Sequence, residues 1–160
     1  MSSTSNTNEQ LVYTKLDELQ IPHITLYHKV VTTMEEGKDI MEKLEGSVLV
    51  NLLLKDNIGQ LYLVIKMIQT KLQFKQLAQT LKVKSLNMAP KDTMTNTLNV
   101  PIGCATLFGI MNDTNNKIQV LIDSQIPKTK VNFHPMRNDA TTTISPPLRL
   151  WRRHPERAIP

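Results

Sequence analysis

Residues 131–145, VNFHPMRNDATTTIS, hold a dense run of side chains that could bind or activate a substrate. His134 stands directly before a proline, whose ring fixes φ and stiffens the chain. Asn138 and Thr141 follow within seven residues of it. An imidazole beside amide and hydroxyl groups could do acid–base or binding chemistry. The same residue types also stabilise turns for local reasons, so a functional loop and a well-bonded turn stay equally open.

The other residues that could do chemistry form no established pattern. The four histidines are far apart, and the single cysteine, Cys104, has no partner at the spacing of a zinc site. The sequence contains no phosphate-binding loop, dinucleotide-binding signature or nucleophile elbow. Cys104 opens an apolar run, which is typical of a small buried side chain. His23 and His28 flank a short β-prone segment and are interpreted as surface or packing residues. The residues alone therefore give no metal-ligand pattern and no nucleotide-binding pattern.

Composition indicates one soluble globular domain. The 160 residues are 40% apolar and 21% charged, which suffices for a single core. Of the net charge of +5, residues 149–160 contribute +3, so the body is only mildly basic. One cysteine excludes an intrachain disulfide and suits a reducing compartment. With no secretory signal and no apolar run of membrane length, we expect a cytoplasmic protein.

The elements that must position these residues alternate between helical and strand patterns. Helices are predicted for residues 9–21, 33–46, 73–81 and 90–98, the second opened by the capping pair Thr33 and Glu36. Two hairpins are predicted, 47–55 with 60–67 and 104–111 with 117–123, together with short strands at 23–27, near 131 and at 141–145. This indicates one mixed α/β or α+β domain over 9–146, after a disordered segment 1–8 and before an irregular basic tail 147–160.

Four stretches occur in a collinear order that is characteristic of a known family: YHKVVTTMEEG (27–37), NLLLKDNIGQLYLV (51–64), FGIMNDTNNKIQVLID (108–123) and NFHPMRNDATTTIS (132–145). Together they resemble the YbaK/prolyl-tRNA synthetase-associated domain family, nearest to its free-standing alanyl-tRNA(Pro) deacylases (ProXp-ala or PrdX). The resemblance covers roughly residues 10–146 without large gaps.

This resemblance implies a mixed, barrel-like β-sheet surrounded by helices. It also implies hydrolysis, in trans, of the ester that joins a wrong amino acid to tRNA(Pro), with no metal or organic cofactor. The expected partner is the aminoacylated 3′ end of tRNA(Pro), and prolyl-tRNA synthetase is a further candidate.

The resemblance assigns roles to particular residues. His134 falls on the histidine of the family's Phe-His-Pro motif, and Asn51 on the asparagine of its Lys-Asn-Leu strand. Gly103 falls on the glycine of a Pro-Gly-Ser loop whose amides lie near the scissile ester, and Cys104 replaces the serine. These four are the expected catalytic residues. Substrate contacts are expected from Val50, Lys55, Thr33, Glu36, Asn138 and Thr141, although capping alone would explain Thr33 and Glu36.

Position 50 departs from the family, whose strand has a functionally critical lysine there. Val50 can neither donate a hydrogen bond nor carry charge, and losing one preorganised donor typically costs about two to three orders of magnitude in rate. Lys55 shares a face with Asn51, not with Val50. Lys66 on the returning strand could reach inward, but the sequence does not fix its register. Two hypotheses follow: a deacylase, and a non-catalytic relative that binds tRNA or a synthetase.

Overall fold

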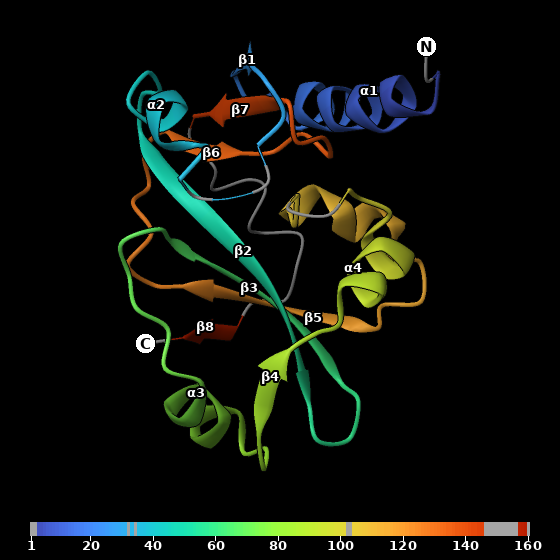
Figure 1. Cartoon of the computed structure of the whole chain (residues 1–160), viewed down its shortest axis with the longest axis vertical. Coiled ribbons are helices and arrows are strands. Elements are labelled where there is room, and N and C mark those ends of the chain that lie inside the picture. The colour runs from blue at the N-terminus through green and yellow to red at the C-terminus, as the bar shows by residue number, and fades with distance from the viewer. Residues whose placement is uncertain (1–2, 32, 34, 102–103, 146–156, 160) are drawn as a thin grey trace.

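The computed structural model describes residues 3–31, 33, 35–101, 104–145 and 157–159, and it confirms the mixed α+β class (Figure 1). The elements are α1 Ser3–Glu18, β1 His23–Tyr27, α2 Lys38–Met41, β2 Ser47–Asp56, β3 Leu61–Met67, α3 Phe74–Leu81, β4 Leu86–Met88, α4 Lys91–Leu98, the 3-10 helix η1 Leu107–Asn112, β5 Ile118–Asp123, β6 Val131–Phe133, β7 Ala140–Ile144 and β8 Arg157–Ile159. The predicted first hairpin and the helices near 73–81 and 90–98 are confirmed.

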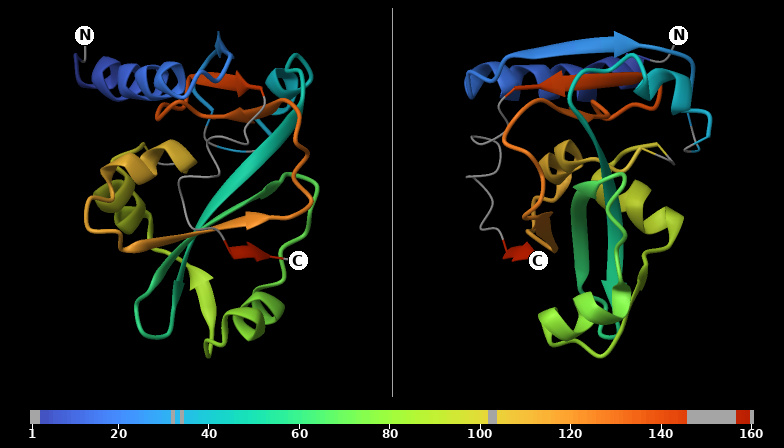
Figure 2. Two further views of the ribbon diagram at one scale, coloured as in Figure 1. Left: turned by 180° about the vertical axis from the view of Figure 1, so that it is seen from behind. Right: turned by 90° about the vertical axis from the view of Figure 1, so that its left-hand side faces the viewer.

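The strands form one mixed sheet in the order β1-β7-β6-β2-β3-β5-β8, with β4 also paired to β2. The pairs β2–β6, β3–β5 and β5–β8 are parallel, and the others are antiparallel. β1, β7 and β6 lie across one end of the β2–β3 ladder, and α1 lies along them (Figure 2). The sheet therefore curves over a shared core, as the expected barrel-like architecture requires.

β2 joins the two parts of this sheet. Its first residues pair with β6, Ser47 with Val131 and Val48 with Asn132. From Leu49 to Lys55 it pairs with β3, and its last residues pair with β4. Among the described strands, none pairs with the other edge of β2 between β6 and β4. Because the Ile68 N–H donates to Val48 O across the β2–β3 ladder, the main-chain groups of Leu49 and Asn51 turn toward this open edge.

Alternate residues of β2 and β3 face two separate cores, as side-chain alternation requires. One face contributes Leu49, Leu53, Leu63 and Ile65 to the core that also holds residues of α1, α4 and η1. The other contributes Leu54, Tyr62 and Val64, which pack with α3. The nearly continuous apolar pattern of β2, predicted as a strand buried on both faces, has this cause.

The predicted hairpin of 104–111 with 117–123 is wrong. Residues 107–112 form η1, and β5 instead pairs in parallel with β3, Leu61 opposite Ile118. Periodicity alone does not separate a short buried strand from a short buried helix. Here Gly109 lies so close to the Leu98 side chain that α4 and η1 pack together. Tertiary packing decides the conformation of this run.

The described structure extends into both chain ends. α1 begins at Ser3. Residues 157–159 form β8 beside β5, whereas the rest of the predicted tail, 147–156 and 160, lies outside the described residues. Thr33 and Glu36 make the reciprocal capping bonds, both at 3.3 Å, although α2 begins only at Lys38. None of the helices in the described ranges is long and apolar enough to cross a membrane.

A partly buried ion-pair network fastens the loop after β6 to α1. The guanidinium of Arg137 donates to Glu9 Oε2 at 2.6 Å and makes a two-fold contact with the Asp139 carboxylate. Glu9 is 5% exposed, and its Oε1 also accepts the hydroxyls of Tyr13 and Tyr27, each at 2.7 Å. Burial by itself raises the pKa of Glu9, but the bonds from Tyr27, Tyr13 and Arg137 outweigh it and lower the pKa.

We predict that Gly46→Ala destabilises the protein by about 3 kcal/mol or more. Gly46 has φ +85°, and an added Cβ would meet the main-chain carbonyl of Lys130, at the point where β2 begins to pair with β6. Gly59→Ala is the matched control. Its φ is +94°, but an added Cβ would find only Lys55 Cε at 3.8 Å, so we expect a cost of about 1 kcal/mol. Urea unfolding measures both, and equal losses would contradict the prediction.

Glu9→Gln should lower the free energy of unfolding by on the order of 2 kcal/mol at pH 7, because a neutral amide replaces the buried carboxylate that accepts from Arg137, Tyr13 and Tyr27. Arg137 keeps its contact with Asp139 in the variant. The folded-state pKa of Glu9 is lowered, so its stabilising contribution is present above the unfolded-state pKa and is lost as the pH falls through the folded-state pKa. The difference between wild type and variant should therefore shrink below about pH 4. Glu18→Gln, in an exposed ion pair with Lys15, is the control and should change little. A pH-independent difference for Glu9→Gln would refute this origin.

Candidate functional site

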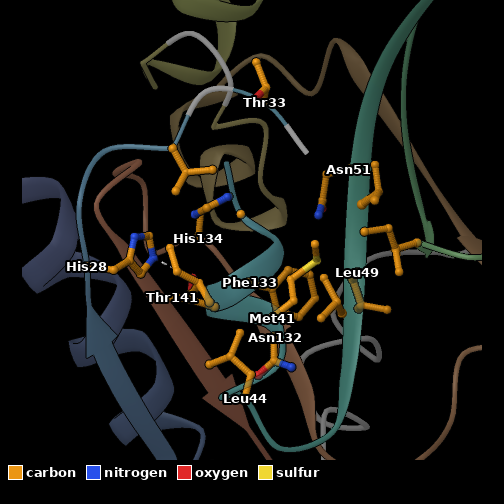
Figure 3. Close-up of a pocket in the computed structure, with 16 residues that line it drawn as sticks. His28, Thr33, Met41, Leu44, Leu49, Asn51, Asn132, Phe133, His134 and Thr141 are labelled. Carbon is orange, nitrogen blue, oxygen red and sulfur yellow. Dashed lines mark hydrogen bonds between the residues drawn. The ribbon is translucent and has the colours of Figure 1, made fainter. Parts of the chain in front are cut away.

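A pocket of about 250 Å³ lies where β2, β6 and β7 meet α2 and the end of β1 (Figure 3). Most of its wall is apolar and comes from Val31, Ile40, Met41, Leu44, Val48, Leu49, Val50, Ile68 and Phe133. Its polar lining consists of His28, Thr33, Asn51, Asn132, His134 and Thr141. Within the described lining there is no lysine, arginine or carboxylate, so the pocket carries no permanent charge.

His134 enters the pocket with one fixed tautomer. Its Nδ1 lies 3.0 Å from the carbonyl oxygen of Ala140. Since a carbonyl only accepts, Nδ1 carries the proton and Nε2 keeps its lone pair. Burial lowers the pKa of His134, against a smaller opposite effect of the Ala140 bond, so the imidazole favours the neutral form. His134 is therefore a hydrogen-bond acceptor and a candidate base.

His28, which the sequence analysis interprets as a surface or packing residue, lines the same pocket. Its Nδ1 lies 2.8 Å from the carbonyl oxygen of Lys29, so this ring also carries its proton on Nδ1. Its Nε2 lies 2.9 Å from Thr141 Oγ1 and accepts the hydroxyl proton when the ring is neutral. Thr141, 8% exposed, then offers only lone pairs to the pocket. The β1–β7 register, with Leu26 opposite Thr141, places His28 here, and no local motif shows that register.

Asn51 stands on β2, across the pocket from His28, His134 and Thr141 (Figure 3). The side chain is 8% exposed, and its Oδ1 is buried without a hydrogen-bond partner among the described residues. An unsatisfied buried polar atom costs about 1–3 kcal/mol, which a bound donor would recover. The main-chain groups of Asn51 face the open edge of β2 as well. Asn51 therefore has side-chain and main-chain groups that could form hydrogen bonds with a ligand.

Three more of the expected substrate contacts lie in or beside the pocket. Thr33 and Val50 line it. Asn138 does not line it, but its carbonyl accepts the Val31 N–H at 2.9 Å and so holds the wall that Val31 forms. Glu36 is exposed and bonds to Thr33.

Two expected site residues lie elsewhere. Lys55 is exposed and pairs with Asn87 of β4, away from the pocket lining. Cys104 is fully buried in the core, and its N–H donates to Pro101 O at 3.1 Å. The amide expected to stabilise an oxyanion is therefore already bonded within a turn. Burial, with a smaller effect of Asp139, raises the pKa of the Cys104 thiol to about 12, so this thiol does not act as a nucleophile. Gly103 lies outside the described residues.

Lys66 does not take the place of a lysine at position 50. It is the cross-strand partner of Val50, but its ammonium donates to the carbonyls of Met67, at 2.9 Å, and Thr70. It lines a second, smaller cavity that also contains Asp123. The described wall of the His134 pocket remains without a cation.

The pocket suits a small ligand that carries several hydrogen-bond donors and only a short apolar side chain. Thr141 Oγ1, His134 Nε2 and Asn51 Oδ1 are three acceptors, and an ammonium group has three N–H donors to satisfy them. No group of three or more His, Cys, Asp or Glu side chains that could hold a metal ion occurs in the described part of the chain. The polar lining of the pocket offers hydrogen-bonding groups, among them the imidazole of His134.

Known proteins share this sequence and fold. Residues 28–150 match the model of the aminoacyl-tRNA editing domain. The prolyl-tRNA editing protein ProX of Acetoanaerobium sticklandii is 32% identical, over 86% of this chain and 85% of that protein. The prolyl-tRNA synthetase associated domain-containing protein 1 of Xenopus laevis is 33% identical, over 86% and 84%. A crystal structure described as a candidate trans-editing enzyme for prolyl-tRNA synthetase shares the fold, with a TM-score of 0.69 at 14% identity and coverage of 99% and 97%. The chain belongs to the aminoacyl-tRNA editing domain family.

Proposed function

We propose that this protein is a trans-acting deacylase that removes alanine from mischarged tRNA(Pro). The observation that carries the proposal is the convergence of Asn51, His134 and Thr141 on a small uncharged pocket. The names of its relatives, a prolyl-tRNA editing protein among them, support the same substrate class.

The pocket fits the esterified amino acid by size and by hydrogen bonding. The α-ammonium of an aminoacyl ester would donate to the Thr141 and Asn51 acceptors, which leaves the Nε2 lone pair of His134 free for the reacting proton. The methyl group of alanine would contact the apolar side chains of Met41, Leu44 and Leu49. A volume of about 250 Å³ lies below the range of typical ligand pockets, which favours small side chains.

Hydrolysis breaks the bond between the ester carbonyl carbon and the ribose oxygen. Water attacks the carbonyl carbon and gives up a proton, and the ribose oxygen of the tRNA leaves as a hydroxyl after it takes up a proton. The neutral Nε2 of His134 is placed to accept or orient that proton. On the other wall, Asn51 offers donors from its amide and its main-chain N–H to the oxygen that gains negative charge. His28 acts on Thr141 and thereby positions the bound amino group.

A second function is supported by one observation. The wall that would hold the family lysine carries Val50, and no lysine or arginine replaces it within the described lining. Such a pocket would bind an aminoacylated end with little or no turnover. On this alternative the protein is a non-catalytic partner of tRNA or of prolyl-tRNA synthetase.

Deacylation of Ala-tRNA(Pro) by wild type, His134→Ala and Val50→Lys separates the two functions. For a deacylase we expect wild-type turnover above the uncatalysed rate, a loss of about 10²-fold in His134→Ala, and a gain in Val50→Lys. Pro-tRNA(Pro) is the control substrate and should survive. A wild type that is inactive while Val50→Lys is active would sink the deacylase and favour the binding protein.

The rate should also report the protonation of His134. Because burial lowers the pKa of His134, the ring stays neutral to lower pH than a free imidazole. We predict a rate that is maintained through pH 6.5, where a free imidazole is half protonated, and that declines only at lower pH. His28→Gln should retain this decline, which assigns it to His134. A decline centred above pH 6.5 would argue against His134 as the base.

A further inference from the structure

The charges of this chain are segregated along its sequence. Residues 57–91 hold six lysines and no aspartate or glutamate, whereas residues 1–56 hold nine acidic residues and five lysines. A mildly basic total therefore conceals one strongly basic segment, which contains β3, α3 and β4.

α3 presents part of this charge as a stripe. Leu77, Ala78 and Leu81 are buried, so the opposite side of the helix faces solvent. Lys75 in the first turn and Lys82, the residue in the left-handed conformation that directly follows the helix, are both exposed. They are seven residues apart, about 10 Å along the helix axis. Lys71 precedes the helix and Lys84 follows it, and both are exposed. No carboxylate lies in the segment to neutralise them.

A small cavity beside α3 also has lysines in its lining. It has a volume of about 70 Å³ and lies along α3, where Lys66, Lys71, Gln76 and Asp123 are among its lining residues. Asp123 is the acidic residue of this lining, and its charge acts on Lys66 beside it. Lys75, Lys82 and Lys84 do not line this cavity, so they remain available to an external anionic partner.

We propose that this face of α3 binds the phosphate backbone of the RNA duplex whose 3′ end enters the His134 pocket. The inference rests on the proposed function. An uncharged pocket gives no Coulombic attraction for a polyanion, so that attraction must come from another surface. That attraction would come from the exposed lysines in and beside α3, which are Lys71, Lys75, Lys82 and Lys84.

The fold places the two sites at a suitable separation. Five residues of β2 lead from Asn51 in the pocket to Asp56, which pairs with Leu86 of β4, and this is about 17 Å of strand. Leu86 packs in the same cluster as Leu81 of α3. α3 and β4 lie at the opposite end of the β2–β3 ladder from α2 (Figure 1). A duplex with a single-stranded 3′ end can span this length of the molecule.

The test compares two charge-matched double variants, Lys75→Gln/Lys82→Gln on the stripe and Lys117→Gln/Lys128→Gln on exposed residues elsewhere. The probe is an RNA hairpin with a single-stranded CCA 3′ end that carries no amino acid. Its Kd is measured at several salt concentrations. For the stripe variant we expect binding at least about tenfold weaker and a slope of log K against log salt that is smaller by about 2. The control should change Kd less than about twofold, and Lys75→Arg/Lys82→Arg should bind as wild type.

Equal effects of the two glutamine variants, or an unchanged salt slope in the stripe variant, would overturn the inference, as would a wild type that does not bind the hairpin but binds an acidic peptide. Glutamine preserves helix propensity, so thermal melting should show intact folding. The readout needs no hydrolysis. An inactive wild type whose RNA binding depends on Lys75 and Lys82 would refute the proposed deacylase and leave this inference standing.

Discussion

The divided pairing of β2 is the constraint on which the site depends. A strand that paired with β6 along its whole length would satisfy its edge and close the pocket. Here β6 covers only Ser47 and Val48, and β4 takes over at Leu54. The intervening main-chain groups of Leu49 and Asn51 face an opening instead of a neighbouring strand. Gly46 makes this possible, because its positive φ turns the chain against Lys130 at the point where the pairing starts.

The opposite wall is ordered by carbonyl groups and by one buried charge network. The carbonyls of Ala140 and Lys29 each hold the Nδ1 proton of a histidine, His134 and His28 respectively. Arg137, held by Glu9 of α1, fixes the loop that carries the first of these carbonyls. Helix α1 thus contributes to a pocket that it does not line. Two rings and a hydroxyl, each with a proton committed to a neighbouring acceptor, contribute to a polar wall without any carboxylate.

In the proposed function, RNA binding and ester hydrolysis take place on different parts of the molecule. The uncharged pocket lies at one end of the β2–β3 ladder, while the exposed lysines in and beside α3 lie toward the other (Figure 1). Val50 contributes to this separation, because the lysine that the family has at this position would place a positive charge in the pocket wall. Lys66, directly across the ladder, does not restore it, because its ammonium is bound to carbonyls beside a different cavity.

The sequence by itself predicted most of the helices and strands, and the family resemblance pointed to Asn51 and His134, one on each wall of the pocket (Figure 3). Two apolar runs separated by a turn defined the β2–β3 hairpin. Helical spacing defined α3, Pro90 marked the start of α4, and collinear motifs singled out Asn51 and His134. It failed at Leu107–Asn112, where a short apolar run is compatible with either a strand or a helix until α4 packs on it. Only the tertiary structure decided that His28 meets Thr141, that Cys104 is core and that Lys55 and Lys66 lie outside the pocket. These facts depend on strand register and on residues far apart in sequence, which no local pattern encodes.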